Sequence, residues 1–128
     1  MTTYRTPLPR PEAPLGRLAA GLRLFVILDL TAATALIHLG LGGSLFALNG
    51  IGFLGLGAAV LAASVLPVPV VRRFAWLPRI GLAGYALVTI GAYLVMGPYI
   101  TLGWIAKAIE VAIIGLVAVD LLVDLRGG

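Results

Sequence analysis

Cysteine is absent from this chain of 128 residues, and charged side chains are scarce. The absence of cysteine excludes disulfide bonds, thiolate metal sites and a cysteine nucleophile. Charged residues make up 11% of the sequence and hydrophobic residues 61%, whereas a soluble domain usually has about a quarter of its residues charged. Because so few charges cannot cover a surface that faces water, the composition predicts an integral membrane protein.

The sequence also lacks the patterns that most catalytic sites need. It has no Ser-His-Asp set, no HExxH spacing and no phosphate-binding glycine loop. Its single histidine, His38, is a poor basis for a metal site. We therefore expect a protein that is not an enzyme and holds no metal ion.

Four apolar runs are each long enough to cross a hydrocarbon core of about 30 Å as a helix. A Gly-Gly-Ser turn separates the first two runs, Pro67 and Pro69 close the second, and a Gly-Pro pair at 97–98 ends the third. The predicted spans are residues 22–41, 45–66, 80–96 and 100–122.

The arginines indicate how these spans are oriented. They lie before or at the start of the first span, between the second and third spans, and after the fourth, whereas the connections at 42–44 and 97–99 carry no lysine or arginine. By the positive-inside rule, both termini and the central loop face the cytoplasm. The formal charge of +4 is thus a topology signal rather than a sign of nucleic-acid binding.

The predicted fold is all-α, an integral membrane four-helix bundle of antiparallel hairpins in the plasma membrane of a prokaryote. A single transmembrane domain over residues 22–125 follows a proline-rich cytoplasmic tail over residues 1–21. Small residues mark the faces on which helices in lipid approach closely. In the second span, Gly55, Ala59 and Ala63 recur at four-residue spacing and predict its contact face.

The loop between the second and third spans combines arginines with aromatic residues. Arg72, Arg73 and Arg79 lie close to Phe74 and Trp76. This mixture suits the headgroup level of an anionic leaflet. General anchoring at the interface is the favoured interpretation, and a specific site for a lipid or a partner is the alternative.

Polar side chains from all four spans fall at a similar depth near the outer ends of the helices. A rise of about 1.5 Å per residue places four of them at one level and the glutamate one turn deeper. The predicted polar cluster, a candidate ligand site, consists of His38, Asn49, Tyr93, Lys107 and Glu110. An ionisable group in the bilayer costs about 2.5 to 3.5 kcal/mol, so each one needs a partner.

Two interpretations of the charged residues in this cluster stay open. Lys107 and Glu110 are three residues apart and can form a structural ion pair on one helix face. Lys107 can also extend to the outer interface through its long stem. Alternatively, Glu110 and His38 form a ligand or proton site.

A second polar group is predicted nearer the cytoplasmic ends, and it consists of Asp29, Ser64, Tyr85 and Asp120. Asp29 and His38 are nine residues apart and lie on opposite faces of a helix, so they do not belong to one site. The Asp29 carboxyl is expected to bond Tyr85 or Ser64. A turn towards Arg23 at the interface is the alternative.

Three stretches of the chain together resemble a known family. They are HLGLGGSLFALNGIGFLGL at 38–56, the pair Arg72 and Arg73 after a proline break, and LGWIAKAIEVAII at 102–114. Over about residues 22–122 the chain is similar to small, uncharacterised four-span membrane proteins of halophilic archaea and some bacteria. The recurring positions of that family correspond here to His38, Asn49, Gly50, Gly52, Lys107 and Glu110. The resemblance implies a four-helix membrane fold and brings no known reaction.

The favoured function is a non-catalytic component or accessory subunit of a membrane complex. Its expected partners are the lipid bilayer and either other membrane subunits or further copies of itself, with no nucleic acid. One alternative is an electron-transfer subunit that binds haem b or quinone. With one histidine, haem b requires a dimer, a second axial ligand such as Lys107, or a five-coordinate iron. Quinone would instead form hydrogen bonds with His38 and Tyr93. The other alternative is a proton or small-solute carrier that uses Glu110 and His38.

Overall fold

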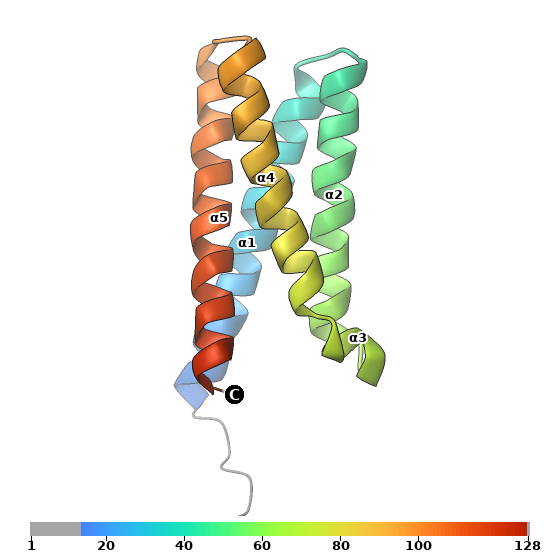
Figure 1. Cartoon of the computed structure of the whole chain (residues 1–128), viewed down its shortest axis with the longest axis vertical. Coiled ribbons are helices and arrows are strands. Elements are labelled where there is room, and N and C mark those ends of the chain that lie inside the picture. Colours follow the sequence, from blue (N-terminus) through green and yellow to red (C-terminus); the bar gives the residue numbers. More distant parts are fainter. Residues whose placement is uncertain (1–13, 128) are drawn as a thin grey trace, which may run out of the picture.

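The computed structural model describes residues 14–127, and nearly all of them are helical (Figure 1). Four long helices and one short helix follow one another, with no strand in this part of the chain. The helices are α1 (Pro14–Gly40), α2 (Ser44–Val65), α3 (Pro69–Arg73), α4 (Trp76–Met96) and α5 (Thr101–Gly127). The all-α class predicted from the sequence is therefore confirmed.

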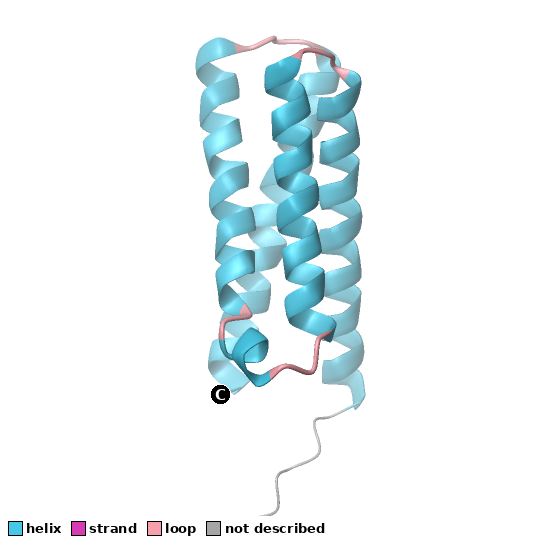
Figure 2. Ribbon diagram, turned by 90° about the vertical axis from the view of Figure 1, so that its right-hand side faces the viewer, coloured by secondary structure: helices cyan, strands magenta, loops and turns pink. Residues whose placement is uncertain are grey.

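The four long helices lie side by side (Figure 1, Figure 2). α1 contacts α2 and α5, and α4 contacts the same two helices, so each long helix has two neighbours. The α1–α2 and α4–α5 connections lie together at the end drawn uppermost in Figure 1, while α3 and the last residues of α5 lie at the opposite end. We refer to these as the upper and lower ends.

The helices begin and end differently from the predicted spans. α1 begins at Pro14, before the predicted start at residue 22, and α5 continues to Gly127, past the predicted end at residue 122. Hydropathy locates the segment that suits hydrocarbon, whereas a helix continues into the interface wherever its backbone hydrogen bonds can form. Residues 1–13, the first part of the predicted tail, lie outside the described residues.

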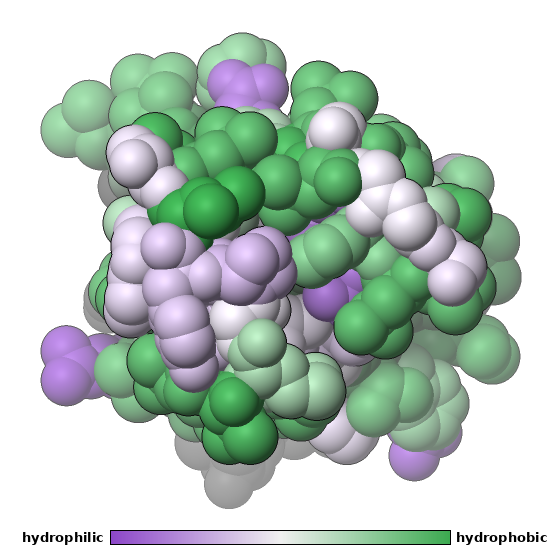
Figure 3. Space-filling model, turned by 90° about the horizontal axis from the view of Figure 1, so that it is seen from above, coloured by the Kyte–Doolittle hydropathy of each residue, from purple (hydrophilic) through white to green (hydrophobic). Residues whose placement is uncertain are grey.

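α1, α2 and α4 are long and apolar enough to cross a membrane, which identifies a membrane protein. Their outward-facing positions carry large hydrophobic side chains, such as Leu36 on α1, Leu48 on α2 and Val88 on α4. In a view onto the upper end, Figure 3 shows hydrophobic residues around much of the rim and paler or purple residues between them. Such an exterior suits contact with lipid.

The interior has an apolar part and a polar part. The apolar part is one cluster of buried side chains from the four long helices: Ile27, Ala35, Phe53, Val60, Leu82, Ala86, Ile113 and Val117. Five polar side chains are buried towards the upper end: Thr34, His38, Thr89, Lys107 and Glu110. Because lipid is as apolar as the core, these polar contacts help to fix which helix faces point inward.

Candidate functional site

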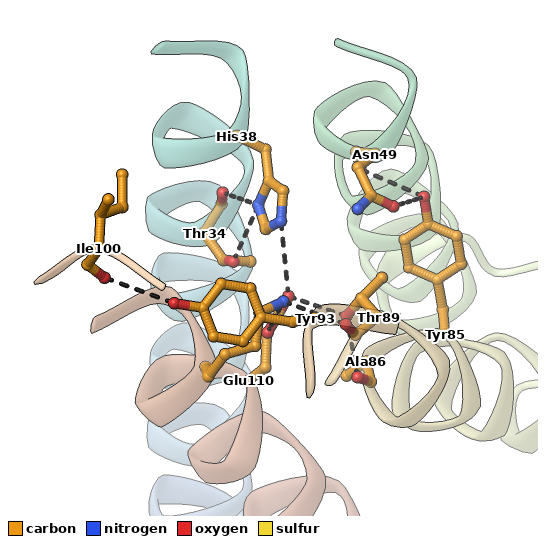
Figure 4. Close-up of polar contacts among 10 residues, drawn as sticks. Thr34, His38, Asn49, Tyr85, Ala86, Thr89, Tyr93, Ile100 and Glu110 are labelled. Atoms are coloured by element: carbon orange, nitrogen blue, oxygen red, sulfur yellow. Dashed lines mark hydrogen bonds and ion pairs between the residues drawn. The ribbon is translucent and has the colours of Figure 1, made fainter. Parts of the chain in front are cut away.

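Glu110 lies at the centre of the polar interior, with none of its surface exposed. Its Oε2 lies 2.6 Å from Nζ of Lys107 on the same helix, and its Oε1 accepts a hydrogen bond of 2.9 Å from Oγ1 of Thr89 on α4. Nε2 of His38 on α1 lies 3.9 Å from the same Oε1. These four residues, which we term the Glu110 cluster, bring three helices to one carboxylate (Figure 4).

Helix geometry creates the pair of Lys107 and Glu110, since residues three apart share one face of α5. The Lys107 ammonium turns inward and leaves 7% of the residue exposed, so the extension to the outer interface that the sequence allows does not occur. Its Nζ also lies 3.4 Å from the carbonyl oxygen of Thr89 and 5.4 Å from the centre of the Tyr93 ring. Lys107 Nζ and Glu110 Oε2 are close enough for an ion pair, but their angles do not meet those of a hydrogen bond. The two buried charges offset each other's desolvation.

The imidazole of His38 is oriented by its own helix. Its Nδ1 lies 2.8 Å from the carbonyl oxygen of Thr34, one turn earlier, which assigns the proton to Nδ1 as the donor. Nε2 then faces Glu110 across a distance too long for a hydrogen bond. The ring is 3% exposed and packs against Phe53. His38 therefore presents Nε2 to the side of Glu110.

A cavity of about 60 Å³ adjoins the cluster. His38, Thr89 and Lys107 contribute polar walls, and Asn49 and Tyr93 complete the polar lining. The apolar lining comes from the upper parts of α2 and α4 and the residue that follows α4: Leu45, Phe46, Ala92, Met96 and Gly97. One water molecule needs about 10 to 15 Å³ of such space. The cavity therefore has room for a few water molecules beside the Glu110 cluster.

Asn49 and Tyr93 border this cavity without bonding Glu110. Asn49 Oδ1 accepts a hydrogen bond of 2.8 Å from the hydroxyl of Tyr85 on α4. The Tyr93 hydroxyl donates to the carbonyl oxygen of Ile100 at 3.4 Å. Both predicted residues therefore belong to the cavity wall rather than to the Glu110 cluster.

The second predicted polar group, Asp29, Ser64, Tyr85 and Asp120, is not brought together. The Tyr85 hydroxyl bonds Asn49 on α2, and the Ser64 hydroxyl donates to the carbonyl oxygen of Val60 on its own helix. Asp29 is exposed, on the face of α1 opposite the core, and the expected contact with Tyr85 or Ser64 does not form. The rotation of α1 about its own axis, which sequence spacing does not determine, turns Asp29 outward.

Asp120 lies in an ion network at the lower end. Its Oδ1 is 3.1 Å from Nε of Arg23 on α1, and its Oδ2 is 3.0 Å from Nη1 of Arg79 on α4. The same Nη1 lies 2.6 Å from Oδ2 of Asp124. We term these four residues the Asp120 network. Because Arg23 pairs with Asp120, the alternative pairing with Asp29 does not form.

Four residues of these two sites are not among the predicted site residues: Thr89, Arg23, Arg79 and Asp124. Thr89 bonds Glu110, and its position four residues before Tyr93 places both on one helix face, which is the signal that could have revealed it. From the sequence, both arginines are topology signals, Arg79 is expected at the headgroup level, and Arg23 is an alternative partner of Asp29. Their pairing with Asp120 depends on how three helices pack, which no local spacing encodes.

The surroundings of His38 do not fit haem or quinone. Nδ1 is engaged by the carbonyl oxygen of Thr34, and Nε2 faces Glu110. Lys107, the candidate second axial ligand, is paired with Glu110 as well. The adjoining cavity of about 60 Å³ is small beside the roughly 300 to 1,000 Å³ of organic-ligand sites. Within residues 14–127, no three His, Cys, Asp or Glu side chains are grouped so that they could hold a metal ion.

Comparison with known proteins identifies no relative. A scan against protein-family models and searches of curated proteins and of solved structures found nothing that matches the chain. The resemblance to four-span proteins of halophilic archaea and some bacteria therefore stays a prediction.

Proposed function

We propose that this protein is a non-catalytic component of a membrane complex in a prokaryotic plasma membrane, and that it joins the complex through the face of α1 that carries Asp29. The observation that supports this proposal is an acidic side chain exposed within a membrane-crossing helix. Asp29 lies about 17 Å below the upper end of α1, at about 1.5 Å per residue, and it is exposed.

The proposal places all four long helices in the membrane as an antiparallel bundle. α5 buries Lys107, Glu110 and Asp120 on its inner face, while Ile105 and Val111 are exposed on its outer face. This distribution suits a fourth span, because ionisable residues in membranes face the interior and pair there. The arginines of residues 14–127 lie at the lower end. We assign this end and both termini to the cytoplasm by the positive-inside rule.

Asp29 lies among large hydrophobic side chains on the outer face of α1. Phe25, one turn before it, and Leu36, two turns after it, are 62% and 66% exposed. Ile27, on the buried face, points into the core. Within the part of the chain that the structure describes, no side chain bonds the Asp29 carboxylate, and the nearby Arg23 is engaged by another aspartate.

A carboxylate in contact with lipid is costly, by about 2.5 to 3.5 kcal/mol on insertion scales. A partner helix that places a basic or hydrogen-bonding side chain against Asp29 would remove this cost. The connections between the described helices are too short to form a domain outside the membrane. An accessory role that depends on helix contacts therefore fits the chain better than a catalytic one.

Native mass spectrometry of the protein extracted in mild detergent tests this role. We expect the wild type to carry the mass of another subunit or of a second copy, and Asp29→Leu to lose it. Asp124→Asn is the matched control, because it removes a carboxylate at the lower end and leaves the outer face of α1 unchanged. A wild-type protein that emerges as a bare monomer would contradict the proposal.

Single-cysteine crosslinking locates the contact, because the natural chain has no cysteine. A cysteine at Leu36, on the Asp29 face, should crosslink to the partner in membranes. A cysteine at Val88, which is 70% exposed on α4, serves as the control and should not crosslink. Equal crosslinking at both positions would place the contact elsewhere.

A second candidate function, a proton carrier, is favoured by the geometry of the Glu110 cluster. The buried Glu110 carboxylate lies 3.9 Å from Nε2 of His38, and His38 lines a cavity with room for water. Glu110→Gln should abolish proton flux in proteoliposomes and leave the helices folded, while Asp124→Asn should keep the flux. Unchanged flux in Glu110→Gln would remove this candidate.

A further inference from the structure

An apolar groove of about 400 Å³ lies at the lower end, where α2, α3 and α4 meet. Ala59, Ala62 and Ala63 of α2 form one side, and Val70 of α3 and Leu77 of α4 lie opposite them. The alanines leave space that larger side chains would fill. The volume falls within the range of about 300 to 1,000 Å³ typical of sites for small molecules.

Two prolines create this groove. Pro67 lies in the break after α2, and Pro69 begins α3, so the helical hydrogen bonds do not continue from α2 into α3. Figure 1 shows α3 projecting sideways from the lower end of α2 before the chain enters α4. The groove is the space left between the displaced short helix and the two long ones.

Two arginines lie on α3, the short helix that helps to line the groove, and neither has a carboxylate partner among the described residues. Arg72 and Arg73 occupy the last turn of α3, and both are exposed. Arg23 and Arg79 at the same end are instead paired with Asp120. No ion pair to Arg72 or Arg73 occurs among residues 14–127, so their charge is available to an external anion.

Phe74 connects the charge to the groove. Its ring lines the groove, and the guanidinium carbon of Arg73 lies 5.9 Å from the ring centre. A molecule that filled the apolar space would therefore have its polar end close to a guanidinium group. Arginine presents several donors that match the oxygens of a phosphate.

We propose that this groove binds an anionic phospholipid of the surrounding leaflet, with an acyl chain against the alanines of α2 and the headgroup phosphate on Arg72 and Arg73. An anionic phospholipid has an acyl chain that suits the apolar groove and a phosphate that suits the two arginines. Each basic residue near an anionic headgroup should raise the affinity about fivefold.

The two tryptophans allow a direct test. Trp76 precedes Leu77 of the groove, whereas Trp104 lies at the upper end against Tyr93. In a Trp104→Phe background, Trp76 fluorescence reports lipid at the groove. In vesicles of mixed composition, we expect phosphatidylglycerol with brominated acyl chains to quench Trp76 more strongly than brominated phosphatidylcholine at the same mole fraction.

Variants in the same background separate the parts of the site. Arg72→Gln with Arg73→Gln should lower the preference for phosphatidylglycerol about 25-fold, while Arg72→Lys with Arg73→Lys keeps the charge and much of the preference. Ala59→Leu should weaken quenching by filling the groove. Arg126→Gln, which changes an exposed arginine near the end of α5, is the control and should leave the preference unchanged.

Several results would overturn the proposal. Equal quenching by the two lipids in the starting protein would show that the arginines select no headgroup. A preference that persists in the double glutamine variant, or that falls equally in Arg126→Gln, would show that the charge effect is not local. Loss of the preference on addition of free glycerol phosphate would show a phosphate site without the acyl chain, and unchanged quenching in Ala59→Leu would place the lipid outside the groove.

Discussion

Glu110 is the most enclosed charged residue of the described chain, and its environment determines what single substitutions do. Its carboxylate pairs with the Lys107 ammonium and accepts a hydrogen bond from the Thr89 hydroxyl. Removing one partner of a buried ion pair leaves the other charge desolvated without compensation. Removing both is often tolerated, because the desolvation cost disappears together with the attraction.

We therefore expect Glu110→Leu alone to lower the free energy of unfolding by about 3 to 5 kcal/mol. Lys107→Met combined with Glu110→Leu should return the stability close to that of the wild type. Thermal unfolding in detergent, followed by circular dichroism, measures both. A double variant as unstable as the single one would show that the pair does not act as a structural unit.

The contact of Lys107 with Glu110 within one helix could be predicted from sequence, whereas the hydrogen bonds between helices could not. Lys107 and Glu110 are three residues apart, so helix geometry alone predicts their pairing. The partners of Asn49 and Asp29 depend on how each helix is rotated about its axis. Because apolar residues lie on nearly every face, hydropathy does not determine that rotation. The hydrogen bond from Tyr85 to Asn49 therefore cannot be predicted from the sequence.

At the scale of helix pairs, glycines decide how closely α2 approaches its neighbours. A β-carbon on Gly52 would collide with the Tyr85 hydroxyl, whereas one on Gly55 would meet open space. The four-residue spacing of Gly55, Ala59 and Ala63 predicts a contact face, and Gly55 lies outside it. The sequence does not distinguish the two glycines. Only the packing shows that Gly52 faces Tyr85 of α4 and that Gly55 does not.

Gly52→Ala should lower the free energy of unfolding by about 1 to 3 kcal/mol, because the added methyl group displaces Tyr85 and breaks its bond to Asn49. Gly55→Ala should have no destabilising effect and can add up to about 1 kcal/mol through its higher helix propensity. Unfolding of the two variants in the same detergent gives the comparison. Equal stability would mean that α2 and α4 separate without cost.

At the lower end, the ion pairs of the Asp120 network connect α1, α4 and α5. Asp120→Asn should lower the free energy of unfolding by about 1.5 to 3 kcal/mol, since two arginines lose a charged acceptor. Asp124→Asn is the control, and it should cost at most about 1 kcal/mol because this carboxylate is largely exposed. A larger effect at Asp124 than at Asp120 would contradict this assignment.

Across the whole molecule, many large hydrophobic side chains are exposed and several charged side chains are buried, unlike in a soluble protein. Charged residues from the fourth apolar segment lie inside, while leucines and valines cover the outside. Composition alone could predict this membrane character, and the apolar runs along the sequence could predict the approximate position of each long helix. Asp29 departs from this order, because it is a charged residue within a predicted span and it faces outward.

Because Asp29 faces outward, the Asp29→Leu variant tests the stability of the single chain and its assembly with a partner separately. Asp29 contributes no bond to the described helices, so Asp29→Leu should leave the unfolding temperature of the isolated chain unchanged or raise it. The same variant should lose its partner in membranes, because the partner's polar group would then face a leucine. A Leu36→Ala variant, which changes the same face without removing a charge, should retain more of the assembly. A fall in the unfolding temperature of isolated Asp29→Leu would show that the carboxylate stabilises the single chain, and the docking role of α1 would then be lost.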